Sequence, residues 1–217
     1  TLDPALIPTD TAVSTYALTR DEAAERKAAA FLLGDNLERT TQGGGIYTYT
    51  SQQGAAAFRD TGSFDAAGSL SQENAEAFCR DFCKAFSYDT PIFTLDETGS
   101  GTATAVRLWN GTPVFNAAVT FTIDQGRVLS ASGALLPETG AETSSGQKPL
   151  SAFAALTAFQ QMRHASSSVV SSITEVSLCY ELQSTTAAPM ALVPSWRIVT
   201  DTATFYVNCI SGTVRRA

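Results

Sequence analysis

The sequence predicts an α+β fold in which helices pack on antiparallel sheets, with a tandem duplication of a unit of one helix and three strands. The first observation is that segments with helical apolar spacing precede segments that alternate apolar and polar residues. The second is a pair of short matches between the two halves: Leu70-Ser71 with Leu150-Ser151, and Ser132-Gly133 with Ser211-Gly212. Between these matched dipeptides, the pattern of each half predicts one helix followed by three strands. The identity between the halves is slight, so the order of elements carries the prediction.

The predicted organisation has four parts. They are an N-terminal helix and β-hairpin region at 1–69, a first helix-plus-sheet unit at 70–136, a linker at 137–149, and a second helix-plus-sheet unit at 150–217. Two such units would pack together or extend their sheets to bury apolar surface that neither covers alone.

In the N-terminal region, a lead with a short helical piece after Asp10 precedes a clear helix. Thr19 and Glu22 match a capping box, and Gly34 suits the C-terminal end of that helix. Two short strands around Gly54 then form a hairpin.

The first helix-plus-sheet unit opens with a helix from Ser71 to about Tyr88. One face of this helix is apolar and carries Phe78, Cys79, Phe82, Cys83 and Phe86. Three strands follow it: Thr104 to Trp109, Val114 to Asp124, and Arg127 to Ser132.

The second helix-plus-sheet unit opens with a helix that starts at Ser151 and stops at the serines from Ser166 onward. A strand over 173–182 and a terminal hairpin over 192–214 follow. We expect one buried face on this hairpin, formed by Trp196, Ile198, Thr200, Phe205, Val207 and Cys209.

Composition limits the partners. The 217 residues are 44% hydrophobic, which is enough for a core, and the formal net charge is −7. Lys and Arg are scattered along the sequence and form no basic stripe, so we expect neither nucleic acid nor an anionic membrane surface as a partner. No apolar run approaches the roughly 20 residues that span a bilayer. Because the sequence begins at Thr1, we expect that an upstream segment was removed, which could carry an export signal or an anchor.

The residues do not predict a catalytic, cofactor-binding or metal site. His164 is the single histidine, and its place at a helix C-terminus predicts a terminal cap or a solvated ring. The segments Gly43 to Gly45 and Gly99-Ser100-Gly101 lack the spacing and context of a nucleotide loop and are interpreted as flexible connectors. The acids at 21, 22 and 25 read as helix-start charges. We therefore expect a protein without enzymatic activity and without a cofactor, and its interaction residues stay unknown at this level.

The four cysteines read as free thiols. Cys79 and Cys83 fit an apolar helix face better than a metal or redox site. Cys179 and Cys209 are expected on strands separated by one strand, roughly 9 to 10 Å apart, which is beyond disulfide reach. The tryptophans at 109 and 196 are expected in the core, the alternative being an exposed recognition surface.

The terminal segment WRIVTDTATFYVNCISGTV resembles the closing hairpin of PepSY-type modules, whose strands typically end in the phrase YVDAxTGxV. The resemblance covers about the last fifth of the chain. Asn208 stands where that phrase has Asp, Cys209 where it has Ala, and Ser211 where it has Thr. It implies that the helix-plus-three-strand unit is PepSY-like.

More broadly, the chain resembles the extracytoplasmic part of YycI/YycH-like regulatory proteins, in its IYTYTS and FRDTGSF segments and its P-x-W-R-I strand. That family has one N-terminal transmembrane anchor, lies outside the cell in Gram-positive bacteria, and modulates the YycG (WalK) sensor histidine kinase, which controls cell-wall metabolism. The resemblance implies a membrane-anchored extracytoplasmic regulator that acts by protein contact. Its partners would be the kinase and a sister regulatory protein.

Two alternatives stay open. One is a PepSY-like inhibitor or pro-region module that binds a peptidase. The other is a module that binds a small ligand between helix and sheet.

Overall fold

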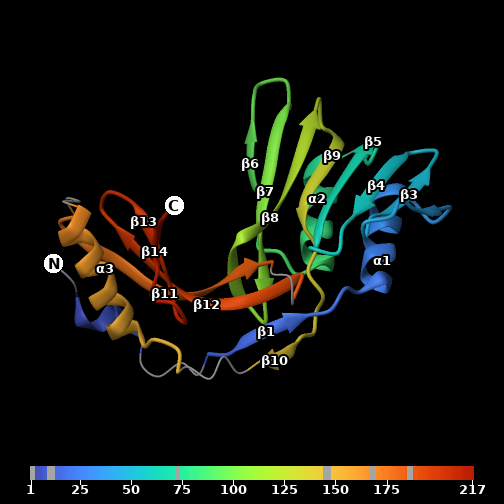
Figure 1. The fold of residues 1–217 in the computed structure, drawn as a ribbon. Coiled ribbons are helices and arrows are strands. Elements are labelled where there is room, and N and C mark those ends of the chain that lie inside the picture. The colour runs from blue at the N-terminus through green and yellow to red at the C-terminus, as the bar shows by residue number, and fades with distance from the viewer. Residues whose placement is uncertain (1–2, 9–12, 72–73, 144–147, 167–169, 185–187) are drawn as a thin grey trace. The chain divides into compact units, whose positions relative to one another are not determined.

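The computed structural model describes residues 3–8, 13–71, 74–143, 148–166, 170–184 and 188–217. The chain forms two compact units (Figure 1). The terminal unit comprises residues 1–17, 141–183 and 191–217, and the central unit comprises residues 18–140 and 184–190. In the described parts of the chain, none of the helices is long and apolar enough to cross a membrane.

The central unit is built on an antiparallel sheet with the strand order β6-β7-β8-β9-β5-β4-β3-β2. Its strands are β2 Glu38–Thr41, β3 Tyr47–Ser51, β4 Gly54–Phe58, β5 Ser63–Gly68, β6 Ile92–Leu95, β7 Gly101–Trp109, β8 Thr112–Asp124 and β9 Arg127–Ala134. The outermost strands of this order are therefore β6 and β2, and each pairs with a single neighbour.

Two helices, α1 Glu22–Leu33 and α2 Ala75–Ala85, bury their apolar residues in the core of the central unit. Phe82 of α2 lies at the centre of this core, with its ring centroid 4.7 Å from that of Phe86 and 5.4 Å from those of Phe31 and Phe121. The other face of the sheet carries threonines and serines. Thr104 and Thr120, for example, are opposite one another, with their hydroxyl oxygens 3.4 Å apart.

The terminal unit has a second core, which lies under the α-helix described in this unit. Its elements are the 3-10 helix η1 Pro4–Leu6, the strands β1 Thr15–Leu18, β10 Ala141–Thr143, β11 Ile173–Gln183, β12 Met190–Thr200, β13 Thr204–Asn208 and β14 Val214–Arg216, and the helix α3 Ala152–Ser166. Phe159 of α3 packs on Phe205, with ring centroids 4.9 Å apart. Trp196 is buried here, and its indole N–H donates to the carbonyl of Leu150 at 2.9 Å.

The predicted fold class of helices packed on antiparallel sheets is wrong in its balance. Strands hold 46% of the described residues and helices 20%, so sheet dominates the structure. The predicted unit of one helix and three strands is wrong too, because four strands follow α2 within residues 70–136 and four follow α3. The extra strands, β6 and β14, have four and three residues, which is too short for an alternating pattern to be recognised.

Several predicted boundaries also need correction. Thr15–Leu18 is strand rather than part of a short helix, and the proposed cap at Asp10 lies outside the described residues. Helix α1 is capped by Asp21, not Thr19, because the Asp21 carboxylate accepts hydrogen bonds from two backbone N–H groups at 3.0 Å. Helix α2 is capped by Asn74 rather than Ser71. The hairpin strands β7, β8, β9, β12 and β13 and the helix end at Gly34 match the prediction.

Candidate functional site

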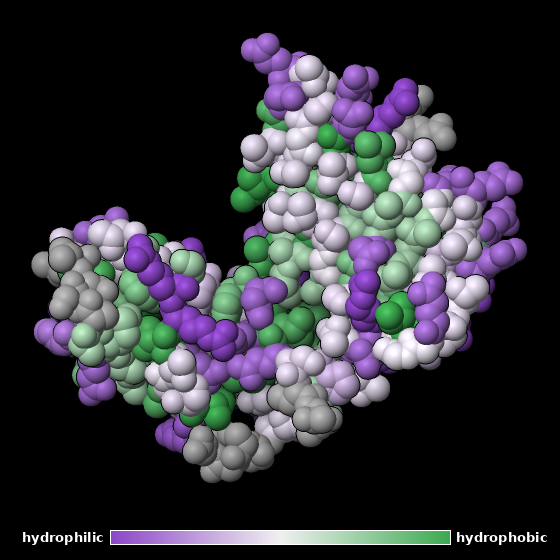
Figure 2. Space-filling view, turned by 45° about the horizontal axis from the view of Figure 1, so that its top comes forward, coloured by the Kyte–Doolittle hydropathy of each residue, from purple (hydrophilic) through white to green (hydrophobic). Residues whose placement is uncertain are grey.

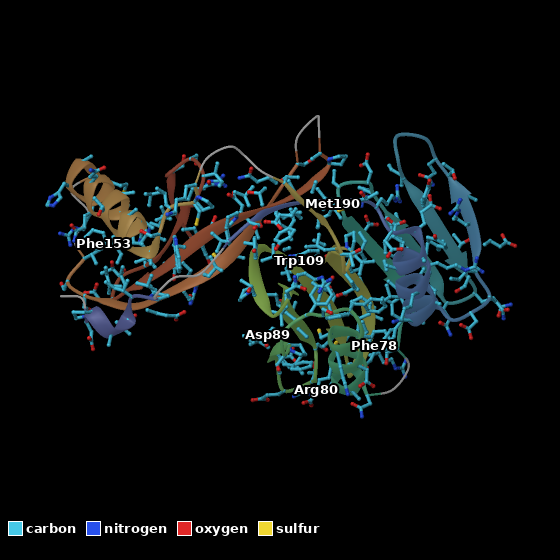
Figure 3. All side chains as sticks on the ribbon, turned by 90° about the horizontal axis from the view of Figure 1, so that it is seen from below. Phe78, Arg80, Asp89, Trp109, Phe153 and Met190 are labelled. Carbon is cyan, nitrogen blue, oxygen red and sulfur yellow. The ribbon has the colours of Figure 1, made fainter. Side chains whose placement is uncertain are left out.

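Strand β6 presents apolar side chains to solvent at an edge of the central sheet. The side chain of Ile92 is 74% exposed and that of Leu95 is 46% exposed. Phe93, between them, turns inward onto the core, and the guanidinium of Arg80 lies 5.4 Å from the centre of its ring. Apolar surface is visible along this edge in Figure 2, and Figure 3 shows Arg80 projecting from α2. An exposed apolar edge strand is a template for pairing with another chain.

The opposite edge of the same sheet is protected. Strand β2 has the sequence ERTT and all four residues are exposed. Arg39 on this strand pairs with Glu22 of α1 at 2.8 Å. Charged and polar side chains at an edge oppose pairing with another strand. The two edges of one sheet therefore differ in chemistry, and of these two edge strands only β6 carries large exposed apolar groups.

The backbone of β6 is also oriented for pairing. The backbone N–H of Asp96 donates to the carbonyl of Ser100 at 2.9 Å, so Asp96 and Ser100 form a hydrogen-bonded pair of the ladder. Because bonded and non-bonded pairs alternate along an antiparallel ladder, the N–H and C=O groups of Phe93 and Leu95 point away from β7. Strand β6 pairs only with β7 among the described strands, so this outer side has no ladder partner there.

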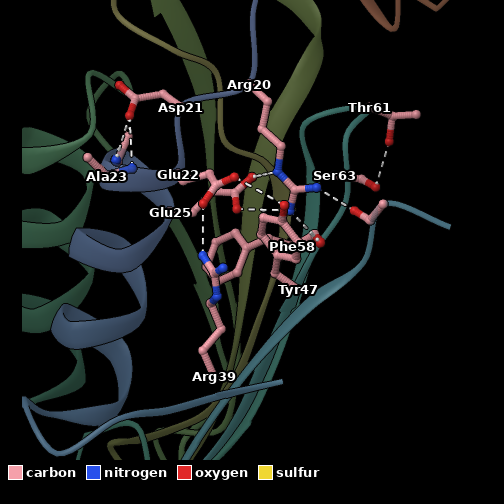
Figure 4. Close-up of polar contacts among 12 residues, drawn as sticks. Arg20, Asp21, Glu22, Ala23, Glu25, Arg39, Tyr47, Phe58, Thr61 and Ser63 are labelled. Atoms are coloured by element: carbon pink, nitrogen blue, oxygen red, sulfur yellow. Dashed lines mark hydrogen bonds and ion pairs between the residues drawn. The ribbon is translucent and has the colours of Figure 1, made fainter. Parts of the chain in front are cut away.

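A second polar site surrounds the start of α1 (Figure 4). Arg20 holds Glu25 through two hydrogen bonds of 2.7 and 2.9 Å, and Glu25 is only 6% exposed. Burial raises the pKa of Glu25, against the opposing effect of the Arg20 guanidinium. Tyr47 lies between two guanidinium groups, with that of Arg20 at 3.8 Å and that of Arg39 at 4.5 Å from its ring centre. The carboxylate of Glu22 accepts from Tyr47 at 3.0 Å and from Arg39 at 2.8 Å.

Next to this cluster lies an open pocket of about 280 Å³, lined by Glu22, Ala23, Arg26, Leu37, Arg39 and Tyr49. Two guanidinium groups therefore line it, and one of them is already paired with a carboxylate. The residue types suit a small polar or anionic ligand.

The structure places each residue that the sequence singled out. His164 is exposed in the last turn of α3, as expected for a cap or a solvated ring. All four cysteines are free, as predicted, and all four are buried. Burial raises the pKa of the Cys79, Cys83 and Cys209 thiols to about 12 and raises that of Cys179 as well.

The tryptophans and the glycine runs also match their predicted places. Trp109 and Trp196 are both buried. Gly43 to Gly45 form the turn between β2 and β3, and the segment Gly99-Ser100-Gly101 belongs to the hairpin between β6 and β7. Among the described residues, no group of three or more His, Cys, Asp and Glu side chains could hold a metal ion.

Three features of the structure were not predictable from the sequence pattern. Glu25 is a buried partner of Arg20 rather than a solvated helix-start charge. Arg107 is fully buried, a position that charged residues rarely take. The sequence pattern did not predict strand β6, because its segment IFTL is only four residues long. The only signal for it was Pro91 directly before two large apolar residues.

Comparisons with known proteins show likeness of fold only. Neither a protein-family model nor a curated protein matches the chain. An uncharacterized protein from Eubacterium rectale aligns over 94% of this chain and 80% of its own, with a TM-score of 0.51 and 12% identity. The C-terminal domain of YpeB from Bacillus megaterium aligns over 92% of this chain and 98% of its own, with a TM-score of 0.41 and 13% identity.

Proposed function

We propose that this chain is a PepSY-like module that acts by protein contact rather than by turnover chemistry, and that β6 is its contact strand. The observation that carries the proposal is the contrast between the two edges of the central sheet. Strand β2 is fully polar, whereas β6 exposes Ile92 and Leu95 beside a row of backbone groups that pair with none of the described strands. Natural proteins protect sheet edges that are not used, so an unprotected edge is a candidate interface.

The finer part of the proposal rests on the sequence resemblance. We infer an extracytoplasmic, membrane-anchored regulator whose partner is a sensor histidine kinase of the YycG type. The PepSY-like phrase around Asn208 and the P-x-W-R-I strand support this assignment.

The test is photo-cross-linking in the cells that make the protein. A photoreactive amino acid replaces Ile92 in one version and Thr40 of β2 in the matched control. Recovery of a sensor histidine kinase from the Ile92 position alone supports the regulatory proposal. Recovery of a peptidase there replaces it with the inhibitor or pro-region function. Equal or absent cross-linking at both positions contradicts protein contact through β6.

A second candidate function is the binding of a small ligand, and the pocket beside α1 favours it. Its arginines, Arg26 and Arg39, suit an anionic metabolite. A carboxylate or phosphate library screened by thermal shift would test this, with Arg26→Gln as the matched variant. A shift that persists in Arg26→Gln would exclude this pocket as the binding site.

A further inference from the structure

The geometry of β6 points to one kind of partner: an extended segment of another protein, apolar at two positions three residues apart and basic on both flanks. We propose that this segment pairs antiparallel with the outer side of β6. The inference rests on the proposed function of β6 as a contact strand and specifies the chemistry of what binds it.

The apolar positions follow from the register of an antiparallel pair. Ile92 and Leu95 are three residues apart and lie on opposite faces of the strand, since side chains alternate. The residues opposite them in an added strand are therefore also three apart, within about 5.5 Å between Cβ atoms. Apolar side chains at these two positions would cover both exposed groups. The backbone of Phe93 and Leu95 would supply the ladder bonds.

The basic flanks follow from the charges at the two ends of β6. Asp89 precedes the strand, and Asp96 and Glu97 follow it directly. All three are exposed. The hydroxyl of Ser100 donates to Asp124 at 3.0 Å, which places a further carboxylate at the hairpin end.

The cations nearby are already engaged or lie away from the outer side of β6. Arg80 pairs with Glu76 at 2.6 Å while it stacks on Phe93. Arg127 of β9 lies opposite Asp124 of β8, and β9 is three strands inward from β6. The carboxylate of Asp96 accepts hydrogen bonds from the Thr98 hydroxyl and from the backbone N–H groups of Ser100 and Thr98, and these bonds lower its pKa. Both ends of the outer side therefore stay acidic.

The same charges argue against a second copy of this chain as the occupant. An antiparallel pair of β6 strands would set Asp89 of one copy against Asp96 and Glu97 of the other. A parallel pair would set each acid beside its own equivalent. Like charges placed directly opposite one another destabilise strand pairs, whereas Lys or Arg in these positions stabilises them.

A synthetic peptide tests the proposal directly. The probe is a fluorescent nonapeptide, Lys-Lys-Val-Thr-Thr-Val-Thr-Thr-Lys, which places basic and apolar residues at the inferred positions. Its control carries Glu in place of every Lys. Binding to the full chain is measured by fluorescence anisotropy at low and high salt. We expect saturable binding of the basic peptide, at least tenfold weaker binding of the acidic one, and weakening by salt.

Two protein variants locate the site. Leu95→Pro removes an outward N–H without removing a bond to β7, and should weaken binding at least tenfold. Thr41→Pro is the matched control on β2. The backbone N–H of Gln42 donates to the carbonyl of Ile46, so the N–H of the preceding residue, Thr41, points to the outer side of that edge. The control should bind as the wild type does. Should Leu95→Pro fail to fold, Ile92→Lys, which adds a charge to the exposed face of β6, replaces it and should weaken binding likewise.

Equal binding of both peptides, unchanged binding by Leu95→Pro or Ile92→Lys, or no binding at all overturns the inferred chemistry. A self-association that Leu95→Pro abolishes overturns it as well, in favour of a second copy. None of these results determines whether a photoreactive group at Ile92 cross-links to a partner protein. Failure of the peptide chemistry is thus distinguishable from failure of β6 as a contact strand.

Discussion

The guanidinium of Arg107 and the carboxylate of Glu138 lie 3.0 Å apart, although the Arg107 side chain is 1% exposed and that of Glu138 is 64% exposed. Arg107 is held mainly by carbonyl groups. It donates to Ser87 at 2.6 Å, to Leu108 at 2.7 Å and to Leu136 at 3.0 Å. The ion pair is thus the solvent-exposed end of a buried hydrogen-bond network, which connects the segment after α2 with the end of β9.

We expect Arg107→Met to lower the free energy of unfolding by about 3 kcal/mol, because buried carbonyls lose their donors. Glu138→Gln should lower it by no more than about 1 kcal/mol, since water screens the exposed carboxylate and the carbonyl bonds remain. Urea unfolding followed by circular dichroism measures both. Equal losses for the two variants would show that the ion pair, and not the carbonyl network, holds Arg107.

Glu22 should make stability depend on pH. Its hydrogen bonds from Arg39 and Tyr47 hold its pKa below the ordinary value of 4.5. A lowered folded-state pKa stabilises the fold above the unfolded pKa, and this stabilisation is lost as the pH falls through the folded value. Glu22→Gln should therefore be less stable than the wild type at neutral pH and equally stable at a pH of about 2 to 3. Urea unfolding at both pH values checks this.

The matched control for that pH series is Glu97→Gln, which changes an exposed carboxylate in the β6–β7 hairpin. Its difference from the wild type should not follow the Glu22→Gln curve. A Glu22→Gln difference that stays constant over the whole pH range would mean that the Arg39 and Tyr47 contacts do not stabilise the carboxylate.

The thiols should be inert in the folded protein. All four cysteines are buried, and burial raises the pKa of Cys79, Cys83 and Cys209 to about 12, so almost no thiolate exists at neutral pH. We expect no reaction with Ellman's reagent in buffer and four reactive thiols after unfolding in guanidinium without reductant. Two thiols instead of four would reveal a disulfide, and one fast thiol in buffer would reveal an exposed cysteine.

The long strands were predictable because their residues alternate over many positions. Strand β8 places Val119, Phe121 and Ile123 in the core and Thr120 and Thr122 on the other face, and its length makes the pattern clear. Strands β2, β6, β10 and β14 have four residues or fewer, so no period can be read from them. The predicted balance of helix and sheet failed for that reason.

The candidate site could not be predicted from the sequence either, but for a different reason. Ile92 and Leu95 look like ordinary core residues, and only the strand order of the sheet shows that they lie at an edge. Arg20 precedes α1, and Glu25, Arg39 and Tyr47 lie on α1, β2 and β3, four segments whose contact the sequence does not predict. The sequence around a single apolar or charged residue does not indicate which residues lie next to it in the folded protein.

Gly68→Ala should destabilise the central sheet strongly. Gly68 has a φ of +145°, which L side chains rarely adopt, and a Cβ there would lie 2.1 Å from the carbonyl oxygen of Gln53 and 2.7 Å from the Cα of Gly54. Both atoms belong to the backbone of the adjoining hairpin and cannot turn aside. We expect a loss of about 3 kcal/mol or more in the free energy of unfolding.

The matched control for Gly68→Ala is Gly44→Ala. Gly44 also has a positive φ, of +58°, but nothing lies within 4 Å of the position of a Cβ. Backbone conformation alone should cost about 1 kcal/mol there. Thermal unfolding of both variants separates steric overlap from strain, and a milder effect of Gly68→Ala than of Gly44→Ala would contradict the close pairing of β4 and β5.

The exposed edge should limit solubility. Because Ile92 and Leu95 are exposed and β6 has no outer partner among the described strands, the edge can pair with other molecules at high concentration. The double variant Ile92→Lys with Leu95→Lys should stay soluble at a higher ammonium sulfate concentration than the wild type. Its free energy of unfolding should change by less than about 1 kcal/mol, since exposed side chains contribute little to the core. Thr40→Lys with Thr41→Lys adds the same charge to β2 and serves as the control. Equal solubility gains for the two double variants would show that added charge, and not the apolar edge, sets the limit.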